Sequence, residues 1–424
     1  RPGLLRIYLD RDAQAARAVR ADVRIGARSL SGALTPRAAS TDADLATTLN
    51  VDIPGDALTP DATLSVAVRA EADAEGVAPA ANPDALFPAS GAATLGVNPS
   101  PAQIELVIVP VRYDADGTGR LPETNAEQLQ RYRDAAFELL PTSSVKVTTR
   151  EPMPWTRPIR GSDGASFSAV LQAVTALRQD DIRAGRVTAD VYYYGAFNPA
   201  ASMRDFCRGG CIAGVSGVPQ NPRDRVSRAS VGLGFRGQEG TMVHEVGHAL
   251  GRYHVACGSV SGADPSYPYT NGSIGAWGYS LVTKRLVSPA TGKDFMSYCS
   301  PAWVSDYNFN ELFQRISFVT ENGLVAKPGG LYRFLEVDDH GGARWGRTVD
   351  LVEAPAADGS DATFLGPDGE ELSTEGAAFY PYSHAEGGYW LVPAHPSSAL
   401  GVRLRGARGS LEVALPPVTA PASR

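Results

Sequence analysis

Apolar and polar positions alternate along the first hundred residues, in short segments separated by Pro and Gly. Residues 63–68 show the two-residue period of a strand with one buried face, and similar apolar segments lie at 4–9, 21–25 and 46–53. Short strands divided by turn residues are typical of an antiparallel β-sandwich. The stretch 76–101 is rich in Pro, Ala and Gly and lacks this period, so its end is interpreted as a linker.

Longer elements replace this pattern in the middle of the chain. An almost continuous apolar run at 104–111 is typical of a strand buried on both faces. Segments with helical spacing then alternate with short apolar strands, which predicts an α/β core. The helices are expected at 123–140, at 166–183, from about 240 onward and at 306–320, and the strands at 145–149, 190–194, 212–218 and 230–233.

The segment 327–330 (KPGG) interrupts the alternation, and short β-like segments such as 389–392 and 411–415 follow it. These features predict a small all-β domain at the C-terminus. The predicted division is therefore an N-terminal β-sandwich-like domain with its linker at 1–100, an α/β domain at 101–326 and a β domain at 327–424.

Composition excludes several classes of protein. The chain has 424 residues, 43% of them hydrophobic and 20% charged, which excludes a disordered chain. No run of about 18 apolar residues is present to span a bilayer. The net charge is −7 without a long basic run, so nucleic acid is not an expected partner. The chain begins at Arg1 rather than Met, and we expect that a leader has been removed.

Four cysteines, Cys207, Cys211, Cys257 and Cys299, lie in one stretch of the chain. An even number is compatible with two disulfides in an oxidising compartment, which predicts a secreted, cell-surface or periplasmic protein. Four buried thiols are the alternative. A zinc cluster is disfavoured because no CxxC pair is present.

Three of the six histidines lie between His244 and His254, in the sequence HEVGHALGRYH. On a helix, His244 and His248 share one face and can bind one metal ion. Gly251 can end the helix and turn the chain back, so that His254 completes a three-nitrogen zinc site with an open position for water. Zinc lowers the pKa of such a water, and Glu245 can accept its proton as general base.

This spacing resembles the signature HExxHxxGxxH of the metzincin clan of zinc endopeptidases. Downstream, the segment 294–298 (DFMSY) resembles the clan's Met-turn, in which Met296 would lie beneath the zinc ligands as a structural base. The resemblance implies that Tyr298 ligates zinc and stabilises the oxyanion of the transition state, with a core tyrosine as the alternative. It covers about 104–322, and Val255 after the third ligand fits none of the better-known groups.

The resemblance also implies a metzincin-like α/β (α+β) fold, with a mixed sheet above an active-site helix and flanking β domains. In the clan, an antiparallel edge strand binds substrate as an added strand, and 212–218 is the candidate, with 230–233 as the inner strand. The residues expected to meet substrate are Ile212, Ala213, Gly214 and Val215.

The same resemblance predicts the disulfide pairing. Cys257 follows the third ligand by three residues, and Cys299 follows the Met-turn methionine by three. If His254 and Met296 both lie at the zinc, these cysteines are neighbours, which leaves Cys207 and Cys211 to pair in a small local loop.

Other candidate residues are weaker. The segment 114–117 (DADG) resembles part of a calcium loop but lacks the later ligands, so a hairpin turn is favoured over a Ca²⁺ site. His340, His384 and His395 lie beyond the predicted catalytic region and are interpreted as surface or core residues.

The sequence therefore predicts a secreted zinc metalloendopeptidase that hydrolyses proteins or glycoproteins, with Glu245 as general base. The β domains would contact glycans or deliver the enzyme to its substrate. The alternative is an adhesion-type protein that binds glycans or proteins and keeps a structural or vestigial zinc site. Glu245 argues against it, because a structural three-histidine site has no use for a general base.

Overall fold

The computed structural model describes residues 1–10, 17–71, 85–99, 102–321, 327–356, 359–407 and 409–416. Its internal contacts divide the chain into two units, Arg1–Pro101 with Ser273–Gly292, and Ala102–Gly272 with Lys293–Arg424. Parts of the predicted linker at 76–101 lie outside the described residues. The division into three domains at residues 101 and 327 stays a prediction. Among the described residues, no helix is both long and apolar enough to cross a membrane.

The N-terminal unit consists of short antiparallel strands around one apolar core. Alternate residues of its strands are buried, for example Ala21, Val23 and Ile25, which meet Leu49 and Val51 of another strand. The two-residue period of the sequence thus forms one buried face. The elements are β1 (Gly3–Ile7) paired with β4 (Leu49–Ile53); a sheet of β2 (Val19–Ile25), β3 (Arg28–Leu34), β5 (Thr63–Ala70), β6 (Leu86–Phe87) and β7 (Ala93–Thr94); the short 3₁₀ helices Leu45–Thr47 and Gly55–Ala57; and, from the inserted segment, β14 (Gly278–Tyr279) paired with β15 (Leu286–Val287).

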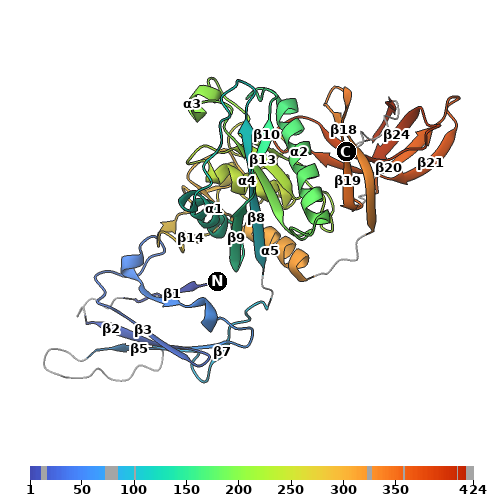
Figure 1. The fold of residues 1–424 in the computed structure, drawn as a ribbon. Helices are drawn as coiled ribbons and strands as arrows, with labels where there is room; N and C mark the ends of the chain where they lie inside the picture. Colours follow the sequence, from blue (N-terminus) through green and yellow to red (C-terminus); the bar gives the residue numbers. More distant parts are fainter. Residues whose placement is uncertain are drawn as a thin grey trace. The chain divides into compact units, whose positions relative to one another are not determined.

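A mixed sheet forms the centre of the second unit (Figure 1). Its strands are β8 (Gln103–Tyr113), β9 (Ser144–Thr149), β10 (Met153–Trp155), β11 (Tyr192–Phe197), β13 (Ala229–Leu233) and β12 (Gly214–Ser216). Strands β9 and β10 both pair with β8, and β11 and β13 follow in order, all of them parallel. Strand β12 pairs antiparallel with β13 and ends the sheet. The parallel strands alternate with helices, as the sequence predicted.

Helices cover both faces of this sheet, because β8 is apolar on both sides. Val107, Val109 and Val111 pack toward α2 (Gly164–Arg183), whereas Leu106 and Ile108 pack toward the other helices. This explains the continuous apolar run in the sequence. The remaining α-helices are α1 (Ala126–Leu139), the short α3 (Met203–Phe206), α4 (Glu239–Ala249) and α5 (Asp306–Glu321), and Thr270–Gly272 form a 3₁₀ helix.

The C-terminal region is a sandwich of two antiparallel sheets. Successive residues of β18 face opposite ways: Leu335 enters the core between the two sheets, and Phe334 enters the core that contains Phe167 and Val174 of α2. The region therefore shares a hydrophobic core with the α/β part. One sheet contains β19 (Ala343–Glu353), β18 (Pro328–Val337), β23 (Gly388–Pro393) and β22 (Ala378–Pro381), and the other contains β21 (Glu371–Gly376), β20 (Asp361–Leu365), β24 (Gly401–Gly406) and β25 (Gly409–Ala414).

Candidate metal centre

Helix α4 and the turn after it bring three imidazole rings together. His244 and His248 are buried on one face of the helix, which ends at Ala249. Gly251 adopts a φ of +90°, a conformation that favours glycine, and the chain turns back to place His254 beside the other two. The distance between ring centroids is 4.7 Å from His248 to each of His244 and His254.

Backbone carbonyls determine which nitrogen of each ring carries the proton. Nδ1 of His244 lies 2.7 Å from the carbonyl oxygen of Phe295, and Nδ1 of His248 lies 2.7 Å from that of Arg252. Nδ1 of His254 lies 3.0 Å from the carbonyl oxygen of Ser261. A carbonyl only accepts hydrogen bonds, so each Nδ1 donates its proton and each Nε2 presents a lone pair.

The three Nε2 atoms converge. Nε2 of His248 lies 3.1 Å from Nε2 of His244 and 3.2 Å from Nε2 of His254. Lone pairs at this separation repel each other unless a cation lies between them. Tetrahedral zinc with bonds of about 2.05 Å would hold two ligand nitrogens about 3.3 Å apart, so this donor set fits zinc.

Burial keeps these three imidazole rings neutral, which is the form that binds a metal ion. Burial lowers the pKa of His244 to about 3. It also lowers the pKa of His254 to about 4, and that of His248 well below the usual value. Neutral imidazole is the metal-binding form of histidine. The rings therefore do not need to lose a proton before they bind an ion at neutral pH.

The predicted Met-turn lies directly beneath α4. Met296 is fully buried, and its Sδ would lie 2.5 Å from a Cβ added at Gly247 of the helix. The carbonyl of Met296 accepts a hydrogen bond of 2.9 Å from the backbone N–H of Val255, next to the third histidine. Asp294 holds the turn in place, since its carboxylate accepts hydrogen bonds from the backbone N–H of Met296 at 2.8 Å and that of Ser305 at 2.9 Å.

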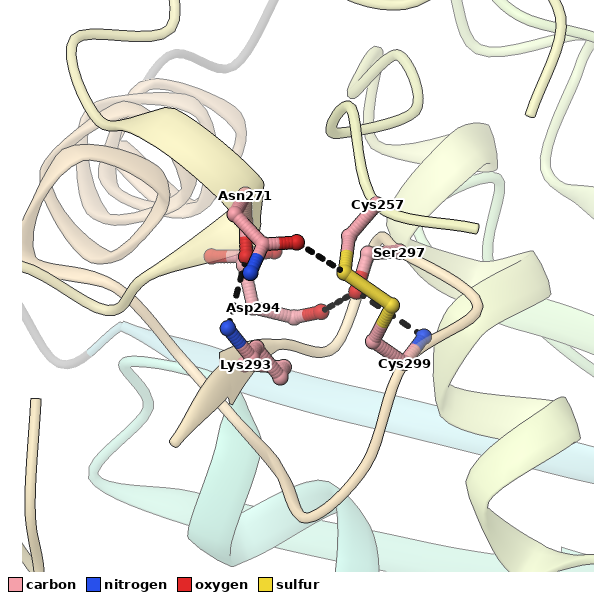
Figure 2. The surroundings of a disulfide bond; sticks show 6 residues. All are labelled: Cys257, Asn271, Lys293, Asp294, Ser297 and Cys299. Atoms are coloured by element: carbon pink, nitrogen blue, oxygen red, sulfur yellow. Dashed lines mark hydrogen bonds between the residues drawn. A yellow bond between two sulfur atoms is a disulfide. The ribbon is translucent and has the colours of Figure 1, made fainter. Parts of the chain in front are cut away.

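A disulfide joins the segment after His254 to the segment after Met296. Figure 2 shows Cys257 bonded to Cys299, with a Cα–Cα distance of 5.7 Å. The hydroxyl of Ser297, which follows Met296, donates to the carbonyl of Asp294 at 2.7 Å and accepts a hydrogen bond from the backbone N–H of Cys299 at 3.3 Å. The structure also contains the short disulfide Cys207–Cys211, so both expected pairs are present.

Glu245 lies beside the three rings in a closely packed position. Its side chain is 1% exposed, and a Cβ added at Gly214 of β12 would lie 2.6 Å from its Cγ. Only glycine leaves room for the carboxylate at this point of the strand. Burial raises the pKa of Glu245 to about 7, which suits a group that accepts and releases protons near neutral pH.

Tyr298 follows the Met-turn and reaches the same centre. Its ring centroid lies 5.1 Å from that of His254 and 6.2 Å from that of His244. The side chain is nevertheless partly exposed, and burial of part of it raises the pKa of the hydroxyl. Tyr298 is therefore a protonated hydroxyl at the edge of the site, able to donate a hydrogen bond.

The predicted substrate strand is present but its outer edge is covered. Of the residues expected there, Gly214 and Val215 belong to β12, while Ile212 and Ala213 precede it. The backbone N–H of Val218, just after the strand, donates to the carbonyl of Pro381 at 3.0 Å. Ser383 donates its backbone N–H to the carbonyl of Ser216, also at 3.0 Å. The edge expected to be exposed is thus paired with the C-terminal region.

The interpretation of His384 as a surface or core residue is wrong, because this side chain lies at the metal centre. One ring nitrogen of His384 and one of each of the three motif histidines all lie within 4.8 Å of one another. Its neighbour Ser383 donates to Oε2 of Glu245 at 3.1 Å. No local motif surrounds either residue, so only the folding of the C-terminal region onto β12 could reveal them.

The acidic segment 114–117 forms a turn. Oδ1 of Asp116 accepts hydrogen bonds from the backbone N–H of Thr118 at 3.2 Å and from its hydroxyl at 2.6 Å. An antiparallel bridge between Tyr113 and Arg120 closes the turn, and Arg120 pairs with Asp116. The carboxylate is thus already occupied by partners of the turn itself.

A cavity of about 290 Å³ opens beside the metal centre. Helix α4 and the turn after it contribute His248, Tyr253 and His254 to its lining, and the C-terminal region contributes Tyr382 and Glu386. The space next to the three rings is therefore bounded by both parts of the unit.

Comparison with known proteins identifies the segment that carries this centre. The sequence profile of a family described as Peptidase M66 matches residues 226–305, which include the three histidines, Glu245 and Met296. This match supports a metallopeptidase, and hence a hydrolase that acts on protein. A search of curated proteins finds no match.

Solved structures resemble the chain only distantly. One is a chain from the structure of a chaperone-substrate complex, with a TM-score of 0.29 and 12% identity, covering 65% of this chain and 40% of the other. Another is metalloproteinase-II from Bacteroides fragilis, with a TM-score of 0.29 and 14% identity, covering 74% of this chain and 92% of the other. The chain thus spans less than half the length of the first of these structures.

Proposed function

We propose that this protein is a zinc-dependent endopeptidase of the metzincin type. The observation that carries the proposal is the convergence of three Nε2 lone pairs at 3.1–3.2 Å, beside the buried carboxylate of Glu245. Further support comes from Met296 beneath Gly247, and from the antiparallel strand β12 at the end of an otherwise parallel sheet. A binding protein with a structural metal site would have no use for a buried general base at this position.

The residues divide the reaction between them. His244, His248 and His254 would hold zinc, which when bound supplies a Lewis acid that polarises a carbonyl and acidifies water. Glu245 accepts a proton from the attacking water and passes it to the leaving amine. Tyr298 donates a hydrogen bond to the developing oxyanion.

Strand β12 gives the substrate its orientation. The edge of a strand can bind an extended peptide as a further strand through backbone hydrogen bonds, so substrate would take the place of the residues that pair with this edge in the structure. Such an edge suits protein substrates in general. The two disulfides favour an oxidising compartment, and we propose secretion on that basis. Contact with glycans through the β domains stays a prediction.

The test is digestion of a peptide library by the full chain and by Glu245→Gln, with the zinc content of both measured. The substitution keeps the shape of the side chain and removes its basicity. We expect equal zinc content and a loss of cleavage of about 10²- to 10⁴-fold, the usual contribution of a general base. Equal cleavage by both proteins would contradict the proposed mechanism.

A further inference from the structure

A turn of the C-terminal region occupies the place where the proposed substrate strand would lie. Residues 382–387 connect β22 to β23, and the start of this turn runs antiparallel to β12. Three contacts make the pairing: Val218 N–H to the carbonyl of Pro381, the bridge between Gly217 and Tyr382, and Ser383 N–H to the carbonyl of Ser216. This is the pattern of a peptide added to a sheet edge.

Ser383 connects the edge of the sheet to the proposed general base. Its hydroxyl accepts a hydrogen bond from the backbone N–H of Ser216 at 2.9 Å and donates to Oε2 of Glu245 at 3.1 Å. Both partners are buried. The carboxylate that would receive a proton from water is thus already engaged by the turn.

His384 closes the remaining side of the metal centre. Its ring centroid lies 4.7 Å from that of His254, 4.9 Å from that of His244 and 5.2 Å from that of His248. Nδ1 is 2.6 Å from the hydroxyl of Tyr298, whose ring stacks on the imidazole. Nε2 is buried without a hydrogen-bond partner among the described residues, although Oε1 of Glu245 lies 2.8 Å away.

We propose that the turn 382–387 is a built-in occupant of the substrate site, in which His384 is a fourth metal ligand and keeps the folded protein latent. The inference rests on the proposed endopeptidase function. One ring nitrogen of His384 lies within 4.8 Å of a ring nitrogen of each of the other three. Nε2 presents the lone pair when Nδ1 donates its proton to the hydroxyl oxygen of Tyr298, and four nitrogen ligands complete a tetrahedral zinc site. The open position that catalysis needs is then filled by the protein itself.

Opening of the site involves the turn and not the whole C-terminal region. The strands on either side are anchored by buried contacts, for example the hydroxyl of Tyr380, which donates to Asp224 at 2.8 Å. Phe334 and Leu391 share a core with α2. By contrast, Ala385 and Gly387 are only partly buried and Glu386 is exposed. A substrate that pairs with β12 would therefore compete with the start of the turn, residues 382–384, and with the hydrogen bond to the carbonyl of Pro381 at the end of β22.

Metal coordination is tested first, on the full chain loaded with Co²⁺. The variants are His384→Ala and, as a matched control, His395→Ala, which removes a histidine of the same region whose ring contacts Phe364 instead. We expect His384→Ala to change the visible spectrum and to let acetohydroxamate, a small metal-binding probe, bind at least about 10-fold more tightly, because a water replaces the fourth nitrogen. The control should match the unmodified protein in both measurements.

Latency is tested by cleavage of a peptide library. If the open turn has a population of about 1–10%, removal of His384 raises turnover about 10- to 100-fold. Ser383→Ala, which frees Glu245 and the N–H of Ser216, should also raise turnover, and it keeps the test decisive if His384→Ala folds poorly. The double variant His384→Ala with Glu245→Gln should be inactive.

The outcomes separate the two proposals. An unchanged spectrum and unchanged acetohydroxamate affinity in His384→Ala would overturn ligation by His384. A changed spectrum without a gain in turnover, while the unmodified protein cleaves and Glu245→Gln does not, would overturn latency and leave the proposed function intact. If no variant cleaves any peptide, the proposed function fails, and the cobalt spectra alone decide whether His384 binds the metal.

Discussion

Two sides, formed by parts of the chain that lie far apart in sequence, enclose the candidate metal centre. The motif side consists of residues 244–254 and 294–299, and the turn side consists of residues 382–387. On the motif side, every imidazole is oriented by a backbone carbonyl 2.7–3.0 Å from its Nδ1. On the turn side, His384 is oriented by a side-chain hydroxyl, that of Tyr298. The imidazoles of the motif side are thus oriented by the backbone, whereas the ring of His384 is oriented by a side chain that can separate from it.

The two sides also differ in the contacts that hold them in place. A disulfide and the buried carboxylate of Asp294 tie the motif side together, independently of the C-terminal region. The turn reaches the site through a few backbone and side-chain hydrogen bonds, each of which contributes about 1 kcal/mol net. We therefore expect the motif side to bind metal by itself and the turn side to modulate access to it.

The largest difference should appear in zinc affinity when one histidine of each side is removed. His248→Ala should weaken binding roughly 10³-fold, since the apparent binding free energy of about 10–16 kcal/mol for structural zinc is shared among its ligands. His384→Ala should have a much smaller effect, because the three oriented motif histidines remain. Competition with a chromophoric chelator measures both affinities. Equal losses would mean that the two sides are equivalent.

A smaller effect is expected from the two disulfides. Removal of Cys257–Cys299, which spans a sequence separation of 42, should lower the free energy of unfolding by about 3–4 kcal/mol, because the closed loop is long. Removal of Cys207–Cys211, with a separation of 4, should cost only about 2 kcal/mol.

Paired Cys→Ser variants and urea unfolding provide the measurement for both bonds. Similar costs would show that Cys257–Cys299 contributes little to the integrity of the motif side. If the Cys257→Ser/Cys299→Ser variant loses zinc and the Cys207→Ser/Cys211→Ser variant does not, the disulfide Cys257–Cys299 supports the motif side of the metal centre.

The smallest effect concerns two glycines of α4. Gly247→Ala places a methyl group 2.5 Å from Sδ of Met296 and should destabilise the protein by about 1–3 kcal/mol, the usual cost of overpacking. Gly240→Ala has open space around its Cβ and should stabilise the helix by about 0.5–1 kcal/mol. Thermal unfolding of the two variants gives opposite shifts in Tm if Met296 supports the helix tightly, and shifts of the same sign if it does not.

Much of the α/β core could be predicted from the sequence. Residues 104–111 form part of a strand with both faces buried because their apolar run is continuous, and helices expected at 123–140 and 166–183 lie at Ala126–Leu139 and Gly164–Arg183. The helix with His244 and His248, and the turn at Gly251, follow from spacing of three and four residues. Each of these features depends on neighbours along the chain.

The placement of His384 depended on tertiary structure alone. Its segment carries no periodicity and no motif, and it meets β12 only because Phe334, Leu391 and their neighbours bury one sheet of the C-terminal region against α2. Local spacing determines how a helix presents two histidines, since 3.6 residues complete each turn. Which distant strand covers a sheet edge is decided by the burial of apolar faces that are far apart in the chain, and no local pattern encodes that choice.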